Sequence, residues 1–110
     1  HDDIAAAVAA DLAFHDGVLQ ASANPFVPVL FSQLRQVLKV TRSQTSSKQD
    51  IRRRALNHHK LIRDAIAAHD EAAAREAMNA HLDQTWDDFT HYFRSSGLTD
   101  LPKSPAASNK

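Results

Sequence analysis

The sequence predicts an all-α protein, an antiparallel helical bundle of about four helices. Apolar residues recur at intervals of three and four along most of the chain, which is the spacing of one face of a helix. No segment alternates between apolar and polar residues with period two, so no strand is needed to explain any part of the chain. Short polar connections join the helical segments, and short connections favour antiparallel neighbours.

The first helix is expected over residues 3–21. Ile4 and Val8 begin a series of apolar residues at helical intervals, and alanine, the residue with the highest helix propensity, fills the positions between them. The helix should end before Pro25, because the residue that precedes a proline is pushed out of the helical region. Asn24 can then cap a second helix, with Pro25 at its first position.

The second helix is expected over residues 25–41, followed by a polar loop over residues 42–47. A broad apolar face supports this helix and predicts that one side of it is buried. The residues of this face are Val27, Leu30, Phe31, Leu34, Val37 and Leu38.

A third and a fourth helix are expected over residues 49–68 and from residue 70 to about residue 93. Asp70 can cap the fourth helix, and the run at residues 95–97 should end it. We expect residues 1–95 to form one domain and residues 96–110 to be a flexible tail. The predicted buried residues of the third helix are Ile51, Ala55, Leu61, Ile62, Ala65 and Ile66.

Composition narrows the range of functions. The 13 basic residues among 110 balance the 13 acidic ones, so no strong positive field favours binding of nucleic acid by this segment. Cysteine is absent, which excludes thiolate metal ligands and disulfides and leaves the seven histidines and the carboxylates as candidate ligands. No stretch approaches about 18 uninterrupted apolar residues, so we expect a cytoplasmic protein with no membrane partner.

Four polar residues lie beside predicted apolar helix faces. Asp11 and His15 are four residues apart, so their side chains leave the same face of the first helix one turn apart. His59 and His81 lie among apolar neighbours on the third and fourth helices. Three imidazoles and one carboxylate suit zinc or another first-row divalent ion. The simpler interpretation is that the three histidines are separate, half-buried and hydrogen-bonded side chains.

Two ordered motifs resemble a known family. The run D-L-A-F-H from Asp11 to His15, followed by Asn24-Pro25, resembles the D-x-x-F-H … N-P signature of the FadR-type C-terminal domain. This FCD domain is the effector domain of many GntR-superfamily transcription regulators. The segment H-K-L-I-R-D-A-I, which opens at His59, and the run M-N-A-H, which closes at His81, are similar to the second motif of the family.

The resemblance implies a metal site and an effector. In metal-binding members the ligands fall on the positions of Asp11, His15, His59 and His81. The resemblance therefore implies a divalent metal ion, with zinc favoured and nickel and manganese as alternatives. A small organic acid, a carboxylate or a sugar acid, would complete the metal sphere. The positions of Arg35 and Arg42, seven residues apart on one predicted helix face, suit forked binding of the other end of this effector. The alternative is that both arginines are ordinary surface residues.

The same resemblance implies a larger regulator. Effector binding would control DNA binding by a homodimer through an N-terminal winged-helix domain, which this sequence does not contain. We also expect the chain to lack the first helices of a complete FCD domain, so that an apolar groove would be exposed. The chain is therefore predicted not to be an enzyme.

Two other functions stay open. A metal-dependent hydrolase would use the same ion to activate water, but the motifs supply no general base other than the ligand Asp11. A purely structural helical interaction module would bind no metal.

The remaining histidines and a basic run are expected to face solvent. The histidines are His1, His58, His69 and His91, and the basic run is Arg52, Arg53 and Arg54.

Overall fold

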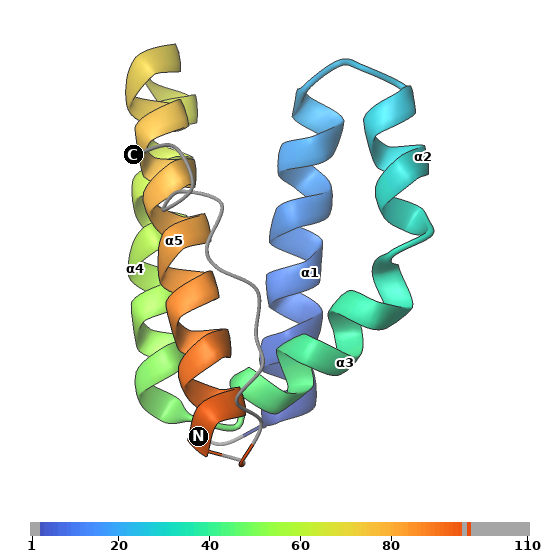
Figure 1. Cartoon of the computed structure of the whole chain (residues 1–110). Helices are drawn as coiled ribbons and strands as arrows, with labels where there is room; N and C mark the ends of the chain where they lie inside the picture. Colours follow the sequence, from blue (N-terminus) through green and yellow to red (C-terminus); the bar gives the residue numbers. More distant parts are fainter. Residues whose placement is uncertain (1–2, 96, 98–110) are drawn as a thin grey trace, which may run out of the picture. The chain divides into compact units, whose positions relative to one another are not determined.

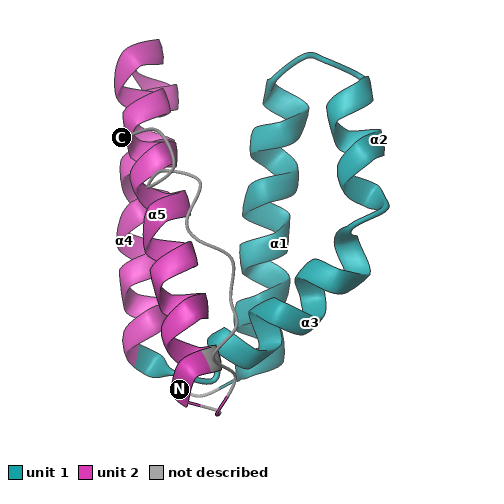
Figure 2. Ribbon diagram, in the orientation of Figure 1, with its two compact units in different colours: residues 1–49 teal, residues 50–110 magenta. Residues whose placement is uncertain are grey.

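A computed structural model describes residues 3–95 and residue 97, and within these residues it contains five α-helices and no strand (Figure 1). The predicted all-α class is confirmed. The chain divides into two compact units, residues 1–49 and residues 50–110 (Figure 2). Unit 1 contains α1 (Ile4–Ala21), α2 (Phe26–Ser32) and α3 (Arg35–Thr45), and unit 2 contains α4 (Gln49–Ala67), which begins at the boundary, and α5 (Glu71–Ser95).

The first helix of unit 1 has the bounds that the sequence predicts. Asp3 caps it, since its Oδ1 accepts a hydrogen bond of 2.9 Å from the backbone N–H of Ala6. After the last turn, Ala23 adopts a positive φ of 57° and turns the chain toward α2. Pro25, and not Asn24 as predicted, occupies the N-cap position of α2, although Asn24 Oδ1 accepts a hydrogen bond of 3.0 Å from the N–H of Phe26. Both α2 and α3 pack against α1.

The predicted single helix over residues 25–41 is wrong, because the chain breaks it at Gln33 and Leu34. Their N–H groups donate to Leu30 and Phe31, three residues back, and this tight turn separates α2 from α3. On either side of this break, α2 and α3 each contact α1.

The predicted loop over residues 42–47 is also mostly helical, since α3 continues to Thr45. The hydroxyls of Thr41, Ser43 and Thr45 donate to carbonyls one turn back, so these polar side chains are satisfied inside a helix. The prediction that the apolar face of residues 25–41 is buried is wrong for most of its members, which are exposed. The exposed members are Leu30, Phe31, Leu34 and Val37.

By length and composition alone, α1 is apolar enough to cross a membrane, although the sequence analysis expected no such segment. The same helix carries the half-buried Asp11 and His15 and packs against α2 and α3. It therefore has the contacts of a helix within a folded unit.

Unit 2 is a hairpin of two long helices. The turn between them places His69 at a positive φ of 55°, and Asp70 Oδ1 then caps α5 by accepting a 3.0 Å hydrogen bond from Ala73 N–H. The helices lie side by side and antiparallel (Figure 1), joined by side-chain hydrogen bonds along their length. After α5 ends at Ser95, Gly97 has a positive φ of 85°, as expected near a helix stop. The predicted tail beyond it lies outside the described residues.

The core of unit 2 agrees in part with the predicted buried set. Ile62 and Ala65 are buried, Ile51 and Ala55 are half-buried, and Leu61 and Ile66 are exposed. From α5 the core receives two polar residues, His81 and Thr90. A fully buried histidine requires polar partners. The contacts of His81 therefore decide what this hairpin can do.

Candidate metal centre

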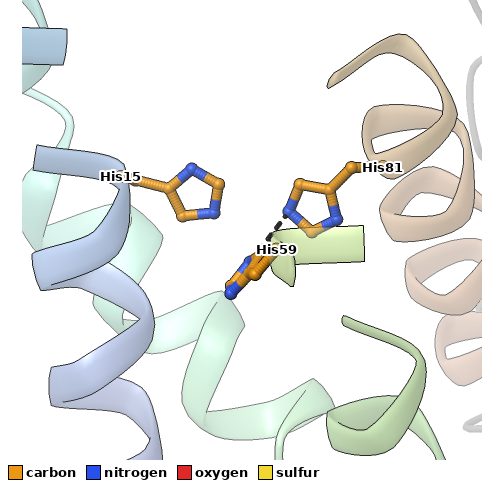
Figure 3. A group of neighbouring side chains, drawn as sticks. All are labelled: His15, His59 and His81. Atoms are coloured by element: carbon orange, nitrogen blue, oxygen red, sulfur yellow. Dashed lines mark hydrogen bonds between the residues drawn. The ribbon is translucent and has the colours of Figure 1, made fainter. Parts of the chain in front are cut away.

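Two of the four predicted ligands face each other in unit 2. His59 projects from α4 and His81 from α5, with 3.2 Å between their Nε2 atoms. The rings meet edge to face, with centroids 4.7 Å apart and planes at 80°. Figure 3 shows this contact as a dashed line; it also draws His15, which belongs to unit 1. His81 is fully buried, with 0% of its surface exposed, whereas His59 is half-buried.

The distance between the two nitrogens suits a shared metal ion. Two imidazole nitrogens bound to one zinc ion, each at about 2.0–2.1 Å and at an angle of about 90–110°, lie about 2.8–3.4 Å apart. The observed 3.2 Å falls within this interval. The pair therefore has the chemistry and the spacing of two neighbouring ligands.

The opposite edge of His81 has polar partners that were not predicted from the sequence. Nδ1 of His81 lies 3.2 Å from Oε1 of Gln84, and the amide nitrogen of Gln84 donates to Asp88. Arg54 on α4 donates to the same carboxylate, with Nη2 2.6 Å from Oδ1. Residues 81, 84 and 88 follow one another at helical intervals, so their spacing could have predicted that they share one face of a helix.

His58 does not face solvent as predicted. It is half-buried, and its ring lies 5.7 Å from that of His81, tilted by 35°. The reason is visible in the pattern, because His58 lies one turn before the buried Ile62 and therefore shares its face. His69 and His91 are exposed as expected, and His1 lies outside the described residues.

The predicted solvated face at residues 52–54 is partly wrong. Arg53 and Arg54 are exposed as predicted, but Arg52 is half-buried. Arg54 reaches across to α5 and binds Asp88, and this hydrogen bond is the largest cause of the raised pKa of its guanidinium.

The other two predicted ligands lie together on α1 in unit 1. His15 Nε2 is 3.7 Å from Asp11 Oδ1, which agrees with the predicted one-turn spacing. Arg42 of α3 brings its Nε to 3.3 Å from Asp11 Oδ2. Burial first, and then the positive charge of Arg42, lower the pKa of His15 to about 4, against a smaller raising effect of Asp16. His15 is therefore neutral at physiological pH, the form in which imidazole binds metals.

Both arginines predicted to bind the effector lie on α3, and each pairs with a carboxylate of α1. Arg42 binds Asp11, and its side chain is largely buried. Arg35 binds Asp16 and is more exposed. Arg42 thus lies beside a predicted metal ligand. Arg35 lies about two turns earlier on α3 and is more exposed.

Comparison with known proteins gives two matches. The sequence profile of the FCD domain matches residues 1–84. The HTH-type transcriptional regulator LutR of Bacillus subtilis (strain 168) is 33% identical to the chain over 92 residues, which is 79% of this chain and 42% of that regulator. The chain thus spans less than half the length of this relative. No solved structure matches the chain.

Proposed function

The chain belongs to the FCD domain family, and we propose that it is the effector-sensing domain of a bacterial transcription regulator of the GntR superfamily. In this proposal a divalent metal ion, zinc in the first instance, anchors a small organic acid. The intact protein would be a cytoplasmic homodimer that binds DNA through a domain outside this segment. FCD domains belong to regulators and not to enzymes, so we do not propose hydrolysis.

The observation that carries the metal proposal is the 3.2 Å approach of the Nε2 atoms of His59 and His81 inside one helical hairpin. A hydrogen bond between two neutral imidazoles would explain one such contact, but the resemblance to metal-binding members of the family also implies that both residues are ligands. Asp11 and His15 are the other two proposed ligands. His15 is neutral without a metal, because its pKa is about 4, so it gives up no proton when it binds one at neutral pH.

Four protein ligands leave room on an ion that accepts five or six, and a carboxylate or hydroxyl of the effector would take it. The ion pair between Arg42 and Asp11 suggests how the arginine participates. If Asp11 held a metal ion, part of its charge would be shared with the ion, and the guanidinium of Arg42 would be available for a forked pair with the acid. Binding of the acid would then favour one conformation of the domain and alter DNA binding in the intact regulator.

The test measures zinc affinity by calorimetry on the chelator-stripped chain. We expect about one zinc ion per chain in the wild type and no measurable binding in His59→Ala or His81→Ala, since each change removes a ligand. His91→Ala is the matched control, because His91 is an exposed histidine on the same helix as His81. A wild-type chain that binds no zinc, nickel or manganese would refute the metal proposal.

A further inference from the structure

A chain of polar contacts runs from His81 away from His59, entirely within unit 2. It passes from Nδ1 of His81 to the amide of Gln84, then to the carboxylate of Asp88, and ends at Arg54. Arg54 also donates to Asp50, at 3.1 Å, so two carboxylates hold its guanidinium. The network links one face of α5 to α4.

The direction of each hydrogen bond follows from the chemistry of the groups. A carboxylate only accepts hydrogen bonds, so the Gln84 amide must turn its NH2 toward Asp88. Its Oε1 then faces His81, at 3.2 Å from Nδ1. Because a carbonyl oxygen also only accepts, Nδ1 of His81 must carry the proton.

This assignment makes Nε2 of His81 a hydrogen-bond acceptor on the side that faces His59. In the metal-free chain His59 then donates the 3.2 Å hydrogen bond between the two Nε2 atoms. We propose that Gln84 is a positioning residue that locks His81 in the Nδ1–H tautomer, and that Asp88 and Arg54 fix the orientation of Gln84. The effect of this tautomer on metal affinity rests on the proposed function, but the assignment of the tautomer does not.

Because His81 is buried, its tautomer depends on Gln84. Its side chain is fully enclosed, so water cannot replace Gln84 as the acceptor for Nδ1–H without rearrangement of the core. Outer partners of ligating histidines orient the ring and hold its tautomer, and their loss typically lowers metal affinity by about 10–100-fold. We expect loss of the Gln84 acceptor to lower metal affinity by this amount, although Gln84 is not itself a proposed ligand.

The experiment reads the tautomer of His81 directly, by long-range ¹H–¹⁵N correlation spectra of the metal-free chain, and zinc affinity separately. Gln84→Met keeps the length of the side chain and removes the carbonyl acceptor. We expect the Nδ1–H form to dominate in the wild type, a mixture of tautomers in Gln84→Met, and zinc affinity about 10–100-fold weaker in that variant. Asn79→Met, an exposed change on the same helix, should alter neither measurement.

A double variant tests the direction of the network. Gln84→Glu combined with Asp88→Asn moves the carboxylate one step closer to His81 and keeps an acceptor on Nδ1–H, so it should restore both the tautomer and the affinity. Gln84→Met with an unchanged Nδ1–H population, or a wild type that carries the proton on Nε2 of His81, would overturn the proposal.

Two further results separate this proposal from the proposed function. If Gln84→Met does not fold, Asp88→Asn answers the same question, because an amide at that position no longer forces the orientation of Gln84; an unchanged tautomer there would also overturn the proposal. Asp87→Asn, exposed and adjacent, is its control. A wild type that binds no metal but holds the Nδ1–H tautomer would refute the metal site and support the network.

Discussion

Burial lowers the pKa of His15 to about 4 from its ordinary value of 6.5, and the charge of Arg42 acts in the same direction. An unfolded chain would therefore take up a proton at His15 below about pH 6.5, whereas the folded chain would stay neutral there until about pH 4. Between these values the unfolded state binds more protons. The free energy of unfolding should therefore fall as the pH falls through this window, and level off below it.

The fall in the free energy of unfolding with falling pH gives a prediction for the metal-free protein. His15→Asn removes the titrating group, so the variant should lose less stability than the wild type between pH 7 and pH 4. We expect a difference on the order of 2 kcal/mol, less than the full conversion of the pKa shift because the ring keeps some contact with water. Urea unfolding in the presence of a chelator, at several pH values, measures it. Parallel curves for the two proteins would contradict the lowered pKa.

At the same scale, the four proposed ligands could be named from the sequence, whereas the residues that support them were only partly within reach. The spacing of Asp11 and His15 depends only on helix periodicity, and the 3.7 Å contact between them agrees with it. Gln84 and Asp88 follow His81 at helical intervals on α5, so the same periodicity could have placed them on one face. The contact of Arg54 with Asp88 depends on how α4 and α5 align, which no local pattern specifies.

Among the elements, helix starts followed local rules most closely. Asp70 was predicted as a cap and accepts a hydrogen bond from the first turn of α5, whereas α2 begins one residue later than predicted, with Pro25 in place of Asn24 at its N-cap. The break between α2 and α3 was missed, since Gln33 and Leu34 are ordinary helix residues. Their turn is better explained by the contacts of both helices with α1 than by any residue that disfavours a helix.

The cap at Asp70 supplies a prediction about α5. Asp70→Ala removes the acceptor for the N–H of Ala73 and should lower the free energy of unfolding by about 1 kcal/mol. Asp83→Ala is the control, because Asp83 is exposed within the same helix and makes no cap. Thermal or urea unfolding of the metal-free variants gives the comparison. Equal losses in the two variants would show that the cap contributes nothing beyond the removal of a charge.

For the whole molecule, the proposed ligands divide evenly between the two compact units. Asp11 and His15 belong to unit 1, and His59 and His81 belong to unit 2. An ion that binds all four would link the stability of the two units. The Nε2 atoms of His59 and His81 already lie at the spacing of two ligands, so these two residues would form a partial site even without Asp11 and His15.

Hydrogen exchange distinguishes a four-ligand site from a partial one. Zinc at 100 times its dissociation constant should stabilise the wild type by about 2.7 kcal/mol. Slower exchange should then appear in α1 and α3 as well as in α4 and α5, because ligands from both units would be held by one ion. In His15→Ala we expect weaker binding and slower exchange in α4 and α5 only, and in His59→Ala no effect of zinc on either unit. If zinc slows exchange only in α4 and α5 of the wild type, then α1 supplies no ligand and the metal cannot transmit a signal between the units.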